Sequence, residues 1–304
     1  MEKTQKSSTD AFAALIAVQL FFGSLPVIGK IVLAVLPPVA LVGFRVGITA
    51  AVLFIVQLVR GRLWLKDRSD YKRLAILSLF GITFNQLLFI SGLSLTKASN
   101  TSLLAVTIPI FAISIGAIIG VERLRAIKVV GIVLAAVGVI VLIDPRNASF
   151  SSETTLGDVL IIINSFSYGI YVATSKEIIT RNGAFRSMMW VFIFAAIVCV
   201  PLGLFSLSSI DVAAVSPMIW WLVLYIAIIA TAGPYLLNAY AIAKVSASTV
   251  AVFIYLQPVI GFLMAAAFLG ETIDTKFVVA AIMVFIGVFL TTRSAPTPKM
   301  AQVD

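Results

Sequence analysis

The sequence has no histidine and a single cysteine among its 304 residues. Without histidine, the chain lacks the commonest general base, metal ligand and neutral-pH proton carrier of proteins. One cysteine, Cys199, cannot form an intrachain disulfide or a multi-cysteine zinc site. We therefore expect no metal, no cofactor and no catalytic residue.

Charged residues are also scarce, at 12% of the chain, whereas hydrophobic residues make up 61%. A soluble domain averages about 25% charged and about 45–50% apolar residues, so a soluble monomer could not cover this much apolar surface. The mean hydropathy of +1.12 predicts an integral membrane protein. The net charge of +9 does not indicate nucleic-acid binding, because the basic residues fall in short gaps between apolar runs.

Long apolar runs occupy almost the whole chain. A helix needs about 20 mostly apolar residues to cross about 30 Å of hydrocarbon, and the runs lack the alternation of barrel strands. The predicted fold class is therefore an all-α integral membrane protein with ten transmembrane helices. The first run is longer than the apolar region of a signal peptide, which is about 7–15 residues, so we expect it to remain as the first span. The ten predicted spans are 11–35, 39–59, 73–95, 99–121, 127–143, 156–177, 187–206, 217–242, 248–270 and 276–293.

The basic residues predict how the chain is oriented in the membrane. With a cytoplasmic N-terminus, most of the 22 lysines and arginines fall in segments on the cytoplasmic side. The positive-inside rule then predicts a multi-pass inner-membrane protein with both termini in the cytoplasm. The densest basic segment, 60–73, is interpreted as a topology anchor, with anionic lipid headgroups as a minor partner.

The two halves of the sequence resemble each other. Pro109 precedes Glu122 by 13 residues, and Pro258 precedes Glu271 by the same interval, 149 residues further along the chain. These matches, in the same order, predict a duplicated five-helix unit, with residues 1–146 as the first copy and 147–304 as the second.

An odd number of spans in each copy has a consequence for topology. The second copy must enter the membrane from the opposite side, which gives an inverted repeat about a pseudo-twofold axis in the membrane plane. Two such halves can exchange conformations and expose a site between them first to one side and then to the other.

Several short motifs resemble the drug/metabolite transporter superfamily of the EamA type. Gly23-Ser24, Lys30 and Arg45 resemble the first two spans of that family. The stretches 97–122 and 244–271, each with a mid-helix proline and a terminal glutamate, resemble its fourth and ninth spans. The resemblance implies a ten-helix carrier that moves small metabolites without ATP and often exports amino acids from bacteria.

Uncharged polar residues near the centres of the predicted spans are the candidate substrate-binding residues. Polar groups inside a membrane are costly and mark function, and inverted-repeat carriers bind their substrates at this depth. The alternative is that each residue merely bonds a neighbouring helix. The candidates are Gln19, Ser24, Asn85, Gln86, Thr107, Asn164, Ser165, Tyr168, Tyr235, Asn238, Tyr255 and Gln257.

Two prolines and two cations complete the candidate site. Pro109 and Pro258 each free a backbone carbonyl, so they either shape the cavity as hinges or form fixed kinks. Lys30 and Arg45 are candidate anion contacts. An arginine as deep as Arg45 could hold a substrate carboxylate in a bidentate manner, or it could snorkel and fix helix packing. The family resemblance favours a structural role for Arg45.

The sequence as a whole predicts a secondary transporter that exports small metabolites, amino acids or related compounds, by alternating access. No carboxylate lies at mid-depth in a predicted span, so we expect a facilitator, with proton or sodium coupling as the alternative. The rival classes are a non-transporting membrane assembly or receptor protein, and an intramembrane enzyme, which would need catalytic groups absent from the core. The expected partners are a small-molecule substrate, membrane lipid and a second copy of the chain, with no nucleic acid.

Overall fold

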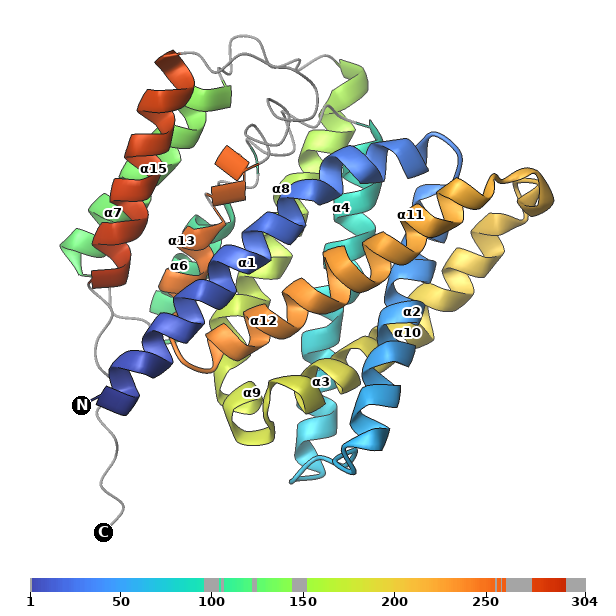
Figure 1. Cartoon of the computed structure of the whole chain (residues 1–304), viewed down its shortest axis with the longest axis horizontal. Helices are drawn as coiled ribbons and strands as arrows, with labels where there is room; N and C mark the ends of the chain where they lie inside the picture. Colours follow the sequence, from blue (N-terminus) through green and yellow to red (C-terminus); the bar gives the residue numbers. More distant parts are fainter. Residues whose placement is uncertain are drawn as a thin grey trace.

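The computed structural model of the chain describes residues 2–95, 104, 107–121, 125–143, 152–254, 256–257, 259–260 and 275–293. Across these residues every regular element is a helix (Figure 1), which confirms the predicted all-α class. Six of the helical stretches are long and apolar enough to cross a membrane. They are Asp10–Leu33, Pro38–Val59, Ser69–Leu95, Thr155–Thr174, Ala184–Leu207 and Pro217–Ile242.

The helices of the first half fall at the first five predicted spans. The third span is divided in the middle by a π-helical turn, and the fourth lies partly outside the described residues. The elements are α1 (Glu2–Leu33), α2 (Pro38–Val59), α3 (Ser69–Ser78), η1 (Leu79–Thr83), α4 (Phe84–Leu95), α6 (Thr107–Ile118) and α7 (Ala126–Ile143).

The second half follows the same order, with a short additional helix after its first span. The predicted span 217–242 is again divided by a π-helical turn, and the predicted span 248–270 is described only in part. The elements are α8 (Ser152–Thr174), α9 (Lys176–Asn182), α10 (Ala184–Leu207), the 3-10 turn η2 (Val212–Ala214), α11 (Pro217–Ala227), the π-helical turn η3 (Ile228–Ala232), α12 (Gly233–Ile242), α13 (Ala247–Phe253) and α15 (Thr275–Arg293).

Local hydrogen bonds define the charged loop between α2 and α3. Gly61 follows the end of α2 with a φ of 62°, a left-handed conformation that glycine adopts without steric cost. The Gln57 side chain donates to the carbonyl of Arg62 at 2.9 Å. Asp67 accepts the backbone N–H of Ser69 at 2.8 Å at the start of α3, and this bond lowers the pKa of the exposed Asp67 carboxyl.

The second helices of the two halves, α2 and α10, pack against each other in opposite directions (Figure 1). Gly43, near the start of α2, lies against Gly203, near the end of α10, and a Cβ on Gly43 would come within 2.9 Å of the Gly203 Cα. At the opposite ends, the Arg60 guanidinium lies 4.7 Å from the centre of the Phe185 ring. The glycines therefore permit an approach that larger residues would prevent.

A second close pair is formed by α7 and α15, which lie side by side at one edge of the molecule (Figure 1). A Cβ on Gly287 would come within 2.5 Å of the Gly131 carbonyl oxygen and 2.8 Å of the Ala135 Cβ. The absent side chain at Gly287 thus allows the backbones to meet.

The two π-helical turns begin at Leu79 and Ile228, which are 149 residues apart. This is the same offset that relates the prolines and glutamates of the two halves. A π turn closes each bond over five residues instead of four, so it contains one residue more than an α turn. Side-chain hydrogen bonds accompany both turns. Ser167 donates to the Phe80 carbonyl within η1 at 2.8 Å, and Thr231, within η3, donates to the Ile226 carbonyl in α11 at 2.6 Å.

Candidate functional site

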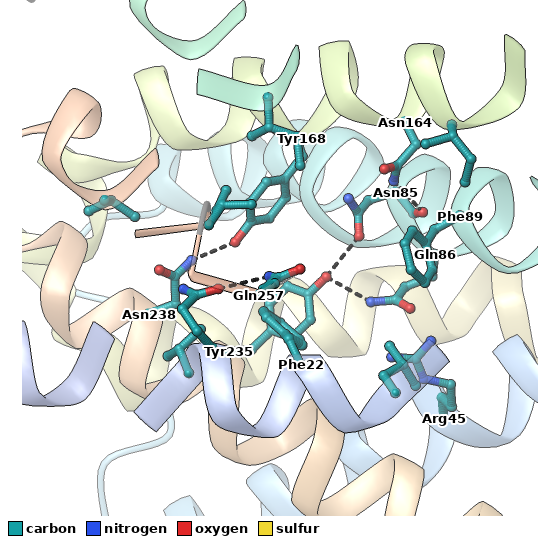
Figure 2. Close-up of a pocket in the computed structure, with 17 residues that line it drawn as sticks. Phe22, Arg45, Asn85, Gln86, Phe89, Asn164, Tyr168, Tyr235, Asn238 and Gln257 are labelled. Carbon is teal, nitrogen blue, oxygen red and sulfur yellow. Dashed lines mark hydrogen bonds between the residues drawn. The ribbon is translucent and has the colours of Figure 1, made fainter. Parts of the chain in front are cut away.

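A cavity lies among helices of both halves, with α1, α2, α4 and α6 from the first and α8, α12 and α13 from the second (Figure 2). Its volume is about 90 Å³, several times the about 10–15 Å³ that one water molecule needs. The lining residues are Val18, Gln19, Phe22, Leu25, Arg45, Asn85, Gln86, Phe89, Ile108, Ile161, Asn164, Tyr168, Tyr235, Asn238, Val250, Ile254 and Gln257.

Most of the predicted substrate-binding residues are brought together in this cavity. They come from five helical regions that are far apart in sequence, so only the tertiary fold can assemble them. Those that line the cavity are Gln19, Asn85, Gln86, Asn164, Tyr168, Tyr235, Asn238 and Gln257.

Other predicted residues lie away from the cavity lining. The Ser24 hydroxyl lies 3.0 Å from that of Tyr225, while Thr107 and Ser165 donate to carbonyls one turn earlier in the chain at 2.7 and 2.9 Å. These bonds fit the alternative of a structural role. Pro109 lies within α6, with its side chain outside the described part of the structure. Tyr255 and Pro258 also fall outside the described residues.

Tyr235 links the two halves at the centre of the cavity (Figure 2). Its hydroxyl accepts a hydrogen bond from Gln86 Nε2 at 2.7 Å and donates one to Asn85 Oδ1 at 2.8 Å. Gln86 and Tyr235 are 149 residues apart, the same offset as the two π turns. The hydrogen bond therefore joins two residues that are related by the offset of the predicted repeat.

Two more hydrogen bonds between side chains lie at the opposite side of the cavity in Figure 2. Gln257 Nε2 donates to Gln19 Oε1 at 2.8 Å, and Asn238 Nδ2 donates to the Tyr168 hydroxyl at 2.5 Å. Carboxamides and phenols both donate and accept. This polar wall can therefore bind both hydrogen-bond donors and hydrogen-bond acceptors of a small molecule.

Apolar side chains form the rest of the wall. The Phe22 ring packs edge-to-face on Tyr235 with centroids 5.8 Å apart, and Phe89 also lines the cavity. An apolar wall with a few polar groups is typical of small-molecule sites. These rings were not predicted to belong to the site, because nothing in the sequence distinguishes inward-facing rings among 21 phenylalanines.

Arg45 is the charged member of the lining set. Its side chain is 0% exposed, so it does not snorkel to the membrane surface. Its Nε and Nη2 donate to the Thr231 hydroxyl at 3.1 and 3.0 Å, a partner in η3 that no sequence motif indicated. Lys30, the other candidate cation, is half-buried in the last turn of α1 and lies outside the lining.

A second polar cluster, here called the α3–α9 cluster, joins the two halves away from the cavity. Asp70 is fully buried and accepts hydrogen bonds from Arg181 Nε at 3.1 Å, from Arg181 Nη2, and from Asn182 Nδ2 at 2.7 Å. Arg73 pairs with Glu177 at 3.5 Å on the exposed side. From the sequence, this basic segment was predicted to be a topology anchor with anionic lipid headgroups as a minor partner. The cluster itself was not predicted, because Asp70 and Arg181 are 111 residues apart.

The described part of the chain contains no group of three or more side chains that could hold a metal ion. The site that the structure offers is thus a polar and apolar cavity with one arginine, which can bind a small molecule by hydrogen bonds and charge.

Known proteins resemble the chain over most of its length. The sequence profile of the EamA-like transporter family matches residues 10–144 and again 155–293. An uncharacterized transporter of Archaeoglobus fulgidus is 27% identical over 74% of this chain and 77% of that protein. The uncharacterized transporter YyaM of Bacillus subtilis is 23% identical over 95% of each chain. A probable amino-acid metabolite efflux pump of Salmonella typhimurium is 26% identical over 98% of this chain and 99% of that protein.

A solved crystal structure, described simply as that of a protein, has the same fold. It superposes with a TM-score of 0.75 at 18% sequence identity and covers 94% of this chain and 98% of its own. The family profile thus matches the chain twice, and the six apolar helices agree with a multi-pass membrane protein. The chain therefore belongs to the EamA-like transporter family.

Proposed function

We propose that the chain is a secondary transporter that moves small metabolites through the central cavity by alternating access, and that it exports amino acids or related compounds. The cavity itself carries the proposal, because it lies between helices of both halves and combines carboxamides, phenols and apolar walls. The name of the Salmonella relative, a probable amino-acid metabolite efflux pump, supports the substrate class and the direction.

The proposal includes ten spans arranged as two inverted repeats, residues 1–146 and 147–304, with both termini in the cytoplasm and the protein in the inner membrane. Three observations support it. The π turns η1 and η3 share the repeat offset, the equivalent residues Gln86 and Tyr235 bond each other, and the equivalent helices α2 and α10 run in opposite directions. Inverted repeats require the last of these.

In this mechanism the two halves move against each other around the bound substrate. When the cavity opens, α3 and α9 either move as one unit or lose the hydrogen bonds that Arg181 and Asn182 donate to Asp70. Pro109 and Pro258 act as hinges within the fourth and ninth spans. We propose a facilitator, since the lining residues that the structure describes include no carboxylate that could carry a proton. A non-transporting assembly or receptor role is not favoured, because the relatives compared are named as transporters or efflux pumps.

Efflux from proteoliposomes tests the proposal. Vesicles containing the purified chain are loaded with a panel of labelled amino acids, and release is compared with protein-free vesicles. Adjacent residues provide a matched pair of variants, because Asn164 lines the cavity and Ser165 does not. We expect Asn164→Ala to slow release several-fold and Ser165→Ala to leave it unchanged.

Three results bear on this expectation. Release no faster than from protein-free vesicles would contradict the transport proposal. Equal effects of Asn164→Ala and Ser165→Ala on release would contradict transport through the cavity. Accumulation driven by a pH gradient would replace the facilitator with a proton-coupled carrier.

A further inference from the structure

The guanidinium group of Arg45 is only partly satisfied by the protein. Its Nε and Nη2 both donate to one atom, the Thr231 hydroxyl oxygen. Its Nη1 is buried and has no hydrogen-bond partner among the residues that the structure describes. A guanidinium carries five N–H donors, so the edge formed by Nη1 and Nη2 retains donor capacity in a side chain that lines the cavity.

Among the residues that the structure describes, the cavity wall offers Arg45 no counter-ion. None of the described lining residues is an aspartate or glutamate, and the buried carboxylate of Asp70 is already bonded to Arg181 and Asn182. A charge buried in a membrane protein is costly unless it is paired or faces a water-filled cavity. An anion in the cavity would satisfy both the charge and the donors of Nη1.

We propose that Arg45 binds the carboxylate group of the transported metabolite, so that this chain carries amino acids or other small carboxylates in preference to the matching amides and amines. This inference rests on the proposed transport through the cavity. The planar guanidinium matches a carboxylate through two parallel N–H···O bonds. Thr231 fixes the Nε side of the group and leaves the Nη1–Nη2 edge for the ligand.

The surroundings of Arg45 suit the rest of such a molecule. Tyr235 lines the same cavity as Arg45, and Gln86, on the same side of the cavity as Arg45 in Figure 2, donates to Tyr235. At the other side, the carboxamides of Gln257 and Asn238 supply oxygen acceptors for an ammonium group. Apolar residues line the cavity between the Arg45 side and the Gln257 side. They accommodate the aliphatic or aromatic side chain of the ligand.

Ligand-induced stabilisation of the purified full-length protein measures this preference. A compound that binds only the folded state raises the midpoint of thermal unfolding with its concentration. The probes form matched sets: leucine, leucinamide, 3-methylbutylamine and 4-methylpentanoate, and the corresponding series for phenylalanine, threonine and alanine. Sodium chloride alone is the probe for an inorganic anion. We expect at least one amino acid or desamino acid to bind at least about tenfold more tightly than its amide or amine.

Variants assign the preference to Arg45. We expect Arg45→Gln to weaken carboxylate binding by about 10- to 100-fold, as for the loss of a charged hydrogen bond, and to leave amide binding unchanged. Arg45→Lys keeps the charge but lacks the planar guanidinium. We expect its carboxylate affinity to lie between those of the wild-type protein and Arg45→Gln. The control is Thr49→Val, since Thr49 is equally buried in α2 and bonds the Ala227 carbonyl at 2.8 Å, but does not line the cavity. It should preserve the ratio of acid to amide affinities.

Specific outcomes would overturn the inference. These are equal binding of acids and amides by the wild-type protein, an unchanged acid-to-amide ratio in folded Arg45→Gln, and stabilisation by chloride that equals that by carboxylates. If Arg45→Gln does not fold, the wild-type ratio and Arg45→Lys decide the question. In all of these cases, efflux of some compound would still support the transport proposal. If no compound is released, both the transport proposal and the inference about Arg45 are contradicted.

Discussion

At the scale of the residue, burial determines how much each charged side chain of the α3–α9 cluster contributes to the stability of the folded protein. Removing the side chain in Arg181→Ala leaves the Asp70 carboxylate, which is 0% exposed, with Asn182 as its remaining side-chain partner. We expect a loss of stability near the lower end of the about 3–5 kcal/mol for a broken buried pair, because the Arg181 side chain is itself 35% exposed. The midpoint of thermal unfolding in detergent measures it.

Arg73→Ala is the matched control, because it removes the other cross-half arginine of the cluster. The side chains of Arg73 and Glu177 are 56% and 74% exposed, and such surface pairs contribute about 0–1 kcal/mol. Equal shifts of the two unfolding midpoints would show that burial of Asp70 does not matter.

The sequence could identify the polar residues of the site but not which of them face it. Asn164 and Ser165 are adjacent and equally suited to a substrate site, yet only Asn164 lines the cavity. In a soluble protein, amphipathic periodicity would indicate the inward face of a helix. In a membrane both the lipid and the protein interior are apolar, so that signal is lost.

At the scale of the element, the π turn η3 positions the hydroxyl that holds Arg45. Deleting Ile229, a residue that is 42% exposed within this turn, should convert the turn to a regular α turn, because the π turn contains one residue more. The buried faces of the flanking helices α11 and α12 then stay buried. We expect the chain to fold, with a slightly lower midpoint of thermal unfolding. Transport should fall, because Thr231 no longer meets Arg45.

Deleting Ile197 provides the control, since it is 66% exposed and lies in α10, a helix without an adjoining π turn. Here the loss of one residue rotates the rest of the helix by about 100°, at 3.6 residues per turn, and buried faces turn outward. We expect little folded protein by size-exclusion chromatography. Similar yields for both deletions would contradict the assignment of η3 as an inserted residue.

Helix positions were predictable because apolar length is a direct requirement of the membrane. The π turns were not, because neither Leu79–Thr83 nor Ile228–Ala232 has a residue pattern that breaks an α-helix. Pro234 follows η3, but the equivalent residue after η1 is Asn85, so proline alone does not explain the turns. Hydrogen bonds to carbonyls at these turns come from distant parts of the chain. Ser167 donates to the Phe80 carbonyl in η1, and Thr49 donates to the Ala227 carbonyl directly before η3. Such long-range partners cannot be found from a local residue pattern.

At the scale of the whole molecule, the antiparallel packing of α2 and α10 predicts which loops share a side of the membrane. Cys199 is buried and is first replaced by alanine, and a single cysteine is then introduced at Arg62 or at Ser209, both exposed. In intact cells we expect a membrane-impermeant maleimide to label Ser209→Cys and not Arg62→Cys. In inside-out vesicles the pattern should be reversed. Labelling of both positions from the same side would contradict the inverted arrangement.

The hydrogen bond between Gln86 and Tyr235 has a consequence for how cargo lies in the protein. In the proposed inverted repeat, identical side chains at these two positions would make the cavity alike from either half. The amide of Gln86 and the phenol of Tyr235 make the two sides chemically different. We therefore expect a molecule with a distinct head and tail to bind in one preferred orientation.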